Sequence, residues 1–189
     1  MNEREKMLAG LPYDPRDKTL SQMRNQCRES LDILNATSQS DVKTRSTILK
    51  SLFGKNGKRL YIESSFKCDY GRNIEVGENF YANFNVVILD AAKVTIGKDC
   101  MIAPQVGIYT ATHPICPEQR TSGIEYAKPI TIGDNCWIGG MAVINPGVTL
   151  GDNVVVASGA VVTKSFGDNL VIGGNPAKVI KTIEVSSTS

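Results

Sequence analysis

Histidine and tryptophan are nearly missing from this chain of 189 residues, which has one of each, His113 and Trp137. A zinc centre built from several histidines is therefore excluded within one subunit. The five cysteines are an odd number, stand far apart and form no C-x-x-C pair, which disfavours a disulfide framework and a zinc knuckle and indicates reduced thiols. Any histidine chemistry must occur at His113.

Net charge and long apolar runs are lacking as well. The 21 Lys and Arg residues nearly balance the 19 Asp and Glu residues, so no strong field favours nucleic acid or an anionic membrane. The charged start, Met1 to Lys6, is atypical of a signal peptide, and no apolar run approaches the roughly 18 residues of a spanning helix. These absences predict a soluble, cytoplasmic protein without a nucleic-acid or membrane partner.

Leucine and the β-branched residues divide the chain near residue 60. Residues 1–60 hold eight of the 11 leucines but only three of the 33 isoleucines and valines. Leucine among Arg, Lys, Gln and Glu favours helix, whereas β-branched residues favour strand. We expect a helical segment over 1–60 and a β body over 61–184. The helices are expected over 20–35, capped by Asp17 or Thr19, and from Asp41 to a stop at Gly54.

The β body repeats every six residues. Aliphatic residues recur at unbroken spacing, at Ile132, Ile138, Ile144, Leu150, Val156 and Val162. The same pattern occurs earlier with a shift at Asp90-Ala91, interpreted as a local bulge, and residues 109–129 lack it and form an inserted loop. Such a hexad predicts a parallel β-solenoid with three hexads per coil and one inward aliphatic side chain per hexad, while small residues two positions earlier help the backbone turn.

Six segments carry a resemblance to a known family. They are Cys68–Gly71, Asn79–Asn85, Tyr109–Pro114, Asn135–Gly139, Ile144–Val148 and Gly173–Ala177. Together with the opening Glu5–Gly10, they resemble the hexapeptide-repeat acetyltransferases that act on maltose and galactosides, over nearly the whole chain. The resemblance implies a left-handed parallel β-helix, an acetyl-CoA donor, a sugar hydroxyl acceptor and no required metal. It also implies a homotrimer with active sites between subunits.

Acetyl transfer to a hydroxyl needs a base, because the attacking oxygen must lose a proton. A near-neutral imidazole is the usual base, and His113 lies in the inserted loop, where functional residues concentrate. No serine stands in a G-x-S-x-G elbow, which favours direct transfer over an acyl-enzyme. Cys116, three residues away, remains the competing nucleophile.

The resemblance extends to further residues of the site. It places Asn83 at the acceptor and the transition state, and Glu125, in the same loop as His113, is our candidate for orienting the imidazole. Further acceptor contacts are expected from Asp17, Arg24, Asp69 and Tyr81. Coenzyme A is expected to contact Trp137, Gly140, Ser158, Thr163, Lys164, Lys178 and Lys181. Aspartate at position 69 resembles the maltose enzymes rather than the galactoside enzymes, and Ala91 stands where the latter have a second acidic residue.

Three other functions must be weighed for a hexad solenoid. The acceptor could be a non-sugar hydroxyl, as on an antibiotic or an amino acid. The chain could also be a non-catalytic scaffold, although His113 and Asn83 argue against it. The carbonic-anhydrase branch of the fold needs several histidines as metal ligands and is excluded by the single histidine.

Overall fold

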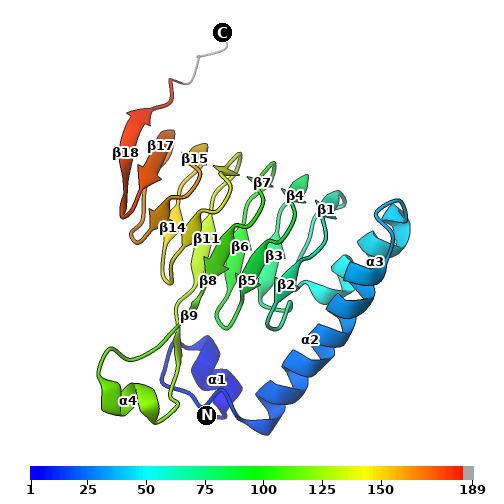
Figure 1. Cartoon of the computed structure of the whole chain (residues 1–189), viewed down its shortest axis with the longest axis vertical. Coiled ribbons are helices and arrows are strands. Elements are labelled where there is room, and N and C mark those ends of the chain that lie inside the picture. Colours follow the sequence, from blue (N-terminus) through cyan, green and yellow to red (C-terminus); the bar gives the residue numbers. More distant parts are fainter. Residues whose placement is uncertain (185–189) are drawn as a thin grey trace.

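A computed structural model describes residues 1–184 of the chain. Within these residues lie four helices, three of them at the start of the chain, and 18 short strands, most of which are stacked (Figure 1). The helices are α1 (Glu3–Leu8), α2 (Lys18–Ala36), α3 (Val42–Leu52) and α4 (Pro117–Thr121). No helix among these residues combines the length and apolar character needed to cross a membrane.

The strands form three parallel faces of a solenoid and one small added pair. The seven-stranded face consists of β1 (Leu60–Ile62), β4 (Phe80–Ala82), β7 (Met101–Ile102), β12 (Trp137–Ile138), β15 (Val154–Val156), β17 (Leu170–Gly174) and β18 (Ala177–Thr182). The five-stranded face consists of β2 (Lys67–Cys68), β5 (Val87–Leu89), β8 (Gly107–Tyr109), β13 (Val143–Ile144) and β16 (Val161–Val162). The four-stranded face consists of β3 (Ile74–Val76), β6 (Val94–Ile96), β11 (Ile130–Ile132) and β14 (Thr149–Leu150).

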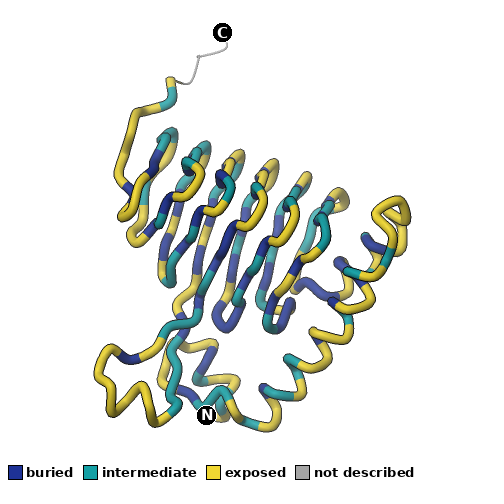
Figure 2. Tube along the Cα trace, viewed as in Figure 1, coloured by how far each residue is buried: buried dark blue, intermediate teal, exposed yellow. Residues whose placement is uncertain are grey.

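Each coil visits the three faces in turn, which confirms the predicted solenoid of three hexads per coil. The strands of one face pair in register, so Ile74, Val94 and Ile130 stack above one another. Figure 2 shows buried and exposed residues alternating along the coils. The prediction of one inward aliphatic side chain per hexad was wrong where a hexad buries two of them, as at Ile130 and Ile132. A three-residue strand points its first and third side chains to the same side, so both fill the interior.

Asparagine and aspartate make the turn between the four-stranded and seven-stranded faces. These residues adopt a left-handed backbone with φ between 55° and 58°, at Asn79, Asp99, Asn135, Asn153 and Asn169. Asn and Asp tolerate this conformation better than other non-glycine residues, because their short polar side chains bond locally. The hexad therefore supplies a turn-forming residue as well as a core residue.

Helices α2 and α3 begin directly after aspartates that were predicted to cap them. Asp17 and Asp41 accept hydrogen bonds from Leu20 N and Thr44 N, so these caps begin α2 and α3. Arg45 of α3 is buried and donates to the carbonyls of Leu34, Thr37 and Ile62. This one guanidinium therefore ties the end of α2 to the first coil.

Gly54 follows α3 for a reason other than the one predicted. Helix α3 ends at Leu52, and Phe53 is extended, with φ −78° and ψ 150°. Gly54 has no left-handed backbone, but a Cβ there would collide with the carbonyl oxygen of Arg72. The glycine therefore permits close packing of the chain on the next turn rather than a left-handed helix stop.

The inserted loop contains structure that the repeat pattern does not predict. Strands β9 (Ala111–Thr112) and β10 (Tyr126–Ala127) form an antiparallel pair that carries α4 at its tip. Ala127 is buried beside Met7 of α1 and Leu20 of α2. The loop thus packs on the N-terminal segment, below the coils in Figure 1.

Candidate active site

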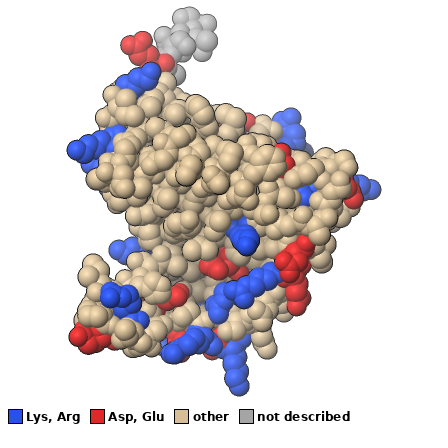
Figure 3. Space-filling view, viewed as in Figure 1, with Lys and Arg blue, Asp and Glu red and all other residues tan. Residues whose placement is uncertain are grey.

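A cavity of about 380 Å³ opens where the inserted loop, the N-terminal segment and α2 meet the coils. Its lining is rich in ionisable side chains and comprises Tyr13, Pro15, Arg16, Arg24, Arg28, Asp69, Tyr70, Leu89, Ala91, Ala111, His113 and Glu125. Charged side chains on this side of the molecule gather over the helices and the loop, while the coils are largely uncharged (Figure 3). The cavity is lined by segments that lie more than 100 residues apart in sequence, such as those of Tyr13 and Glu125.

His113 stands directly after β9, where the antiparallel pair leaves the solenoid. Its side chain is 54% exposed, and its Nε2 lies 3.8 Å from Oε1 of Glu125. The predicted partnership of His113 and Glu125 therefore has a geometric basis, although the distance is longer than a hydrogen bond. A carboxylate beside an imidazole can orient the ring and stabilise it when it takes up a proton.

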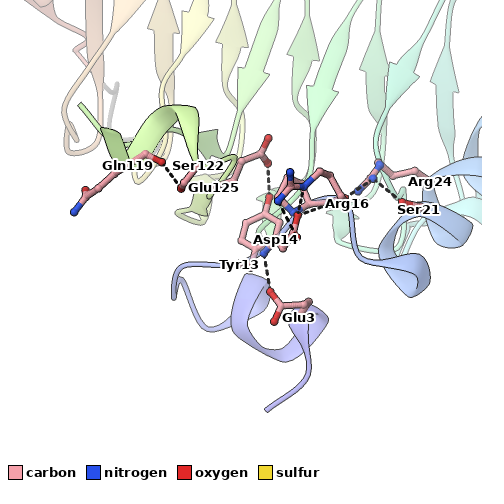
Figure 4. Close-up of polar contacts among 10 residues, drawn as sticks. Glu3, Tyr13, Asp14, Arg16, Ser21, Arg24, Gln119, Ser122 and Glu125 are labelled. Carbon is pink, nitrogen blue, oxygen red and sulfur yellow. Dashed lines mark hydrogen bonds and ion pairs between the residues drawn. The ribbon is translucent and has the colours of Figure 1, made fainter. Parts of the chain in front are cut away.

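Tyr13 fixes the position of Glu125. The Tyr13 hydroxyl donates to Oε2 of Glu125 at 2.7 Å, and the two residues exchange two backbone hydrogen bonds of 3.1 Å (Figure 4). Burial, and then Glu125 itself, raise the pKa of Tyr13, so the phenol stays a donor. The other carboxylate oxygen of Glu125 faces His113.

Arg24 and Tyr70 form the opposite wall of the cavity. Arg24 donates from Nη1 to the Tyr70 hydroxyl at 2.7 Å and from Nη2 to the Pro15 carbonyl at 2.6 Å. Its guanidinium carbon also lies 5.8 Å from the centre of the Tyr70 ring. Burial raises the pKa of the neighbouring Asp69, and the charge of Arg24 opposes that effect. These groups offer donors and acceptors to a polyhydroxylated ligand.

Asp90 supports this wall of the cavity by holding the backbone of Asp69 and Tyr70. It is fully buried, and its carboxylate accepts hydrogen bonds from the backbone N–H groups of Asp69 and Tyr70, both at 2.9 Å, and of Asn73 at 3.3 Å. Burial raises its pKa to about 6, and the hydrogen bonds from Tyr70 and Asp69 counteract part of that rise. The local bulge expected at Asp90-Ala91 lies between β5 and β6 and forms a polar corner that holds the Asp69 loop.

Asn83 and Tyr81 lie elsewhere on the solenoid. Asn83 follows β4, at the edge between the seven-stranded and five-stranded faces, which we call the Asn83 edge. His113 follows the five-stranded face, at a different edge of the prism. Tyr81 points outward and stacks on Tyr61 with ring centres 6.3 Å apart. A single chain does not bring Asn83 or Tyr81 into the cavity of His113.

Two of the expected coenzyme contacts lie along that same edge. Gly140 follows β12 and Ser158 follows β15, and the Gly140 carbonyl accepts from Gly159 N at 2.8 Å, so the two turns stack. Trp137, on the adjoining face, is half exposed. Along the later coils, the Asn83 edge therefore carries the small residues Gly140 and Ser158 next to the half-exposed indole of Trp137.

The remaining predicted residues are more dispersed. Asp17 caps α2 and lies outside the cavity lining, and Thr163 and Lys164 follow β16 at the edge of His113. The Lys164 ammonium lies 5.5 Å from the centre of the Phe166 ring, and Lys178 and Lys181 lie on β18, at the last strand of the stack.

Cys116, the competing nucleophile, is exposed at the start of α4 and donates to Oε2 of Glu118 at 2.8 Å. Within residues 1–184, no group of three or more His, Cys, Asp or Glu side chains is placed to hold a metal ion.

Sequence reasoning missed Tyr13, Arg28, Tyr70 and the supporting role of Asp90. Tyr13 precedes the first long helix and belongs to no repeat, so only its contact with Glu125 reveals it. Asp90 had a detectable signal, because a carboxylate that replaces an expected hexad residue inside a core pattern must find donors.

Two family models match the chain. The maltose acetyltransferase hexapeptide capping motif matches residues 6–57, and the hexapeptide repeat of succinyl-transferase matches residues 129–164. Galactoside O-acetyltransferase of Escherichia coli is 40% identical over 179 residues, which cover 95% of this chain and 88% of the relative.

Two solved structures resemble the whole fold. A maltose O-acetyltransferase of Clostridium difficile has a TM-score of 0.97 and 49% identity, covering 98% of this chain and 99% of that one. A galactoside acetyltransferase in complex with coenzyme A has a TM-score of 0.94 and 40% identity, covering 97% of this chain and 92% of that one.

Proposed function

Because this chain belongs to the family of the maltose and galactoside O-acetyltransferases, we propose that it transfers acetyl from acetyl-CoA to a sugar hydroxyl with His113 as the general base. The observation that carries the proposal is the arrangement of Tyr13, Glu125 and His113 at the mouth of a polar cavity. A solvent-accessible imidazole backed by a fixed carboxylate suits a base that must both accept and release a proton.

The reaction follows from this arrangement. One imidazole nitrogen of His113 faces Glu125, and the other accepts the proton of the acceptor hydroxyl as its oxygen attacks the thioester carbonyl. The tetrahedral intermediate then expels the coenzyme A thiolate, which recovers the proton from the imidazole. The products are the acetyl ester and free coenzyme A, and no covalent enzyme intermediate is needed.

The N-terminal segment supplies much of the acceptor site in this proposal. Tyr13 and Arg24 come from that segment, and Asp69 and Tyr70 come from the first coil. A sugar ring offers adjacent hydroxyls to such a mixture of carboxylate, guanidinium and phenol groups. Acetylation of a non-sugar hydroxyl remains the second candidate, but no particular contact in the cavity favours it over a sugar.

A homotrimer would complete the site with Asn83 of a neighbouring subunit. Outward residues of the seven-stranded face form an apolar row, Tyr61, Tyr81, Met101, Trp137, Val155 and Val171. The five-stranded face continues it with Val87, Gly107, Val143 and Val161, after the exposed Lys67 at the start of this row. The four-stranded face carries Glu75, Thr95, Thr131 and Thr149 instead. The two apolar faces meet at the Asn83 edge, so three subunits could associate around an axis near that edge and bury both faces. In such a trimer, Asn83 of one subunit would face His113 of a neighbouring subunit.

The donor would lie along the later coils in this assembly. Gly140 and Ser158 leave room for the thin pantetheine arm, and Trp137 would form one wall. Thr163 and Lys164 would border the groove from the next edge, and Lys178 and Lys181 carry charge for the phosphates.

The test is thiol release from acetyl-CoA across a panel of mono- and disaccharides, with amino-acid and antibiotic hydroxyls as the non-sugar arm. We expect a sugar to be the preferred acceptor and His113→Ala to lower kcat by about 10² to 10⁴ while acetyl-CoA still binds. Turnover of the variant within a few-fold of wild type would exclude His113 as the base. If a non-sugar hydroxyl is the preferred acceptor, acetyl transfer with His113 as the base still holds, but the proposal of a sugar acceptor is wrong.

A further inference from the structure

Two buried cysteines meet where α2 packs on the first coil. The sulfur of Cys27, on α2, lies 3.5 Å from the sulfur of Cys68, on β2, and 41 residues separate them in sequence. Their exposed fractions are 3% and 7%. The reduced pair therefore places two thiols in direct contact across the junction of the helical segment and the solenoid.

The other three cysteines have different surroundings. Cys100 and Cys136 lie inside the solenoid, where their thiols donate to the carbonyls of Gly133 at 3.1 Å and Gly151 at 3.2 Å. Cys116 is exposed and donates to Glu118. Cys100 and Cys136 also share a side-chain hydrogen bond, but Cys27 and Cys68 are the pair whose sulfurs lie 3.5 Å apart and that borders cavities.

We propose that Cys27 and Cys68 are a site of reversible oxidation, at which a hydroperoxide or a small disulfide converts the two thiols into an intramolecular disulfide. With hydrogen peroxide, the two thiols lose two electrons and two protons, one S–S bond forms, and the peroxide is reduced to two molecules of water. With a small disulfide, one protein thiolate attacks it, breaks its S–S bond and releases one small thiol as a mixed disulfide forms. The second protein thiolate then attacks the mixed disulfide and releases the other small thiol, so the small disulfide is reduced to two thiols.

The sulfurs have little distance to travel. An S–S bond of about 2.05 Å requires them to approach by roughly 1.5 Å, which side-chain rotation and a slight shift of α2 can supply. Contact across a junction between two elements favours this, because a helix can move on a coil more readily than two coils can move within one stack.

Small reactants have a route to both sulfurs. Cys27 borders a cavity of about 140 Å³ together with Met23, Leu52 and Tyr70. Cys68 borders a groove of about 410 Å³ between α2 and the five-stranded face. The hydrogen bond with Cys27, and then burial, raise the pKa of Cys68, so the resting Cys68 thiol keeps its proton and reacts more slowly than an exposed thiol.

The bond would fix α2 against the wall of the acceptor cavity. Cys27 lies on α2 between Arg24 and Arg28, and Cys68 immediately precedes Asp69, and these three neighbours all line the cavity. Oxidation is therefore expected to change KM for the acceptor more than KM for acetyl-CoA. This consequence rests on the proposed function, whereas formation of the bond does not.

The experiment uses the full chain with Cys116→Ser, so that the exposed thiol cannot form bonds between molecules. The protein is incubated for hours with hydrogen peroxide or oxidised glutathione, alkylated under denaturing conditions and mapped by mass spectrometry without reduction. We expect one peptide pair linking Cys27 to Cys68, loss of two of the four remaining thiols, and reversal by dithiothreitol. The cross-link should raise Tm by about 5 to 10 °C.

Matched variants distinguish this pair from general oxidation. Adding Cys27→Ser or Cys68→Ser should abolish the cross-link, whereas adding Cys100→Ala or Cys136→Ala should leave it intact. Four free thiols after treatment, or a link that involves Cys100 or Cys136, would overturn the proposal. An acceptor preference that contradicts the proposed function would leave the mapped bond unaffected, so the two ideas fail separately.

Discussion

Glu125 interacts with two side chains, those of Tyr13 and His113. One oxygen holds the Tyr13 hydroxyl at 2.7 Å and the other faces His113 Nε2 at 3.8 Å. In Glu125→Gln, the amide oxygen can still accept from Tyr13, so the loop should keep its place while the charge beside His113 disappears. We expect kcat to fall about 5-fold, since a partly exposed charge contributes about 1 kcal/mol.

Steady-state kinetics and thermal unfolding measure this effect together. KM for acetyl-CoA and Tm should stay near the wild-type values, and Glu118→Gln, on the same loop, is the control that should change neither rate nor Tm. A kcat equal to wild type in Glu125→Gln would remove Glu125 from the positioning of His113.

Asp90 predicts a pH dependence of stability. Its folded-state pKa of about 6 exceeds its ordinary value of 3.8 because the carboxylate is buried. The folded protein therefore binds this proton more tightly than the unfolded chain. The corresponding stabilisation is complete below about pH 4 and is lost as pH rises through about 6, an effect of about 2 to 3 kcal/mol.

Urea unfolding at fixed protein concentration between pH 4 and pH 7 measures this dependence. The free energy of unfolding of wild type, minus that of Asp90→Asn, should decrease over this interval, because the asparagine cannot titrate. A difference that stays constant with pH would mean that Asp90 is ionised throughout and that its three N–H donors outweigh its burial.

Inward side chains of the hexads decide the stability of the elements. Ile144 of β13 is fully buried in the stacked interior, whereas Thr149 of β14 points outward from the four-stranded face. Ile144→Asp places an unpaired carboxylate in a packed core and should cost about 4 kcal/mol or more. Thr149→Asp is the matched control and should cost less than about 1 kcal/mol. Circular dichroism during urea unfolding compares the two, and equal stability would contradict the hexad assignment.

The elements differ in how far the sequence predicts them. The hexads fix the strands because every coil repeats the same core and turn positions, and Asp17 and Asp41 mark the starts of α2 and α3. Helix α1 has only six residues, and β9 and β10 have two each, so none of them is long enough to show a period. These short pieces gain their order from tertiary contacts, such as those of Met7 with Ala127 and of Tyr13 with Glu125.

At the scale of the molecule, the proposed division of the site between subunits predicts complementation. His113→Ala and Asn83→Ala proteins should each be nearly inactive. Mixing equal amounts after dissociation and reassembly should restore about a quarter of wild-type activity, because a quarter of the interfaces then combine an intact His113 with an intact Asn83. Activity that stays at the level of the separate variants would mean that the two residues do not meet across an interface.

The same division explains what sequence could contribute to the site. Resemblance supplied His113 and Asn83, but no pattern within one chain relates the two edges on which they lie. The place of a residue on the solenoid can be predicted from the sequence, because each hexad moves the chain from one face to the next. Approach of a loop to a helix more than 100 residues away, as at Tyr13 and Glu125, depends on packing that periodicity does not encode.

A stack of parallel coils has two ends at which free backbone groups could pair with another molecule, and this chain closes them differently. Helices α2 and α3 lie beside the first coil (Figure 1). At the other end, β18 runs antiparallel to β17, and the register shifts between Val171 and Ile172. An antiparallel edge does not offer the hydrogen-bond spacing that a further parallel coil requires. The seven-stranded face therefore repeats like a fibre but ends in a strand on which a further parallel coil cannot be added in the same register.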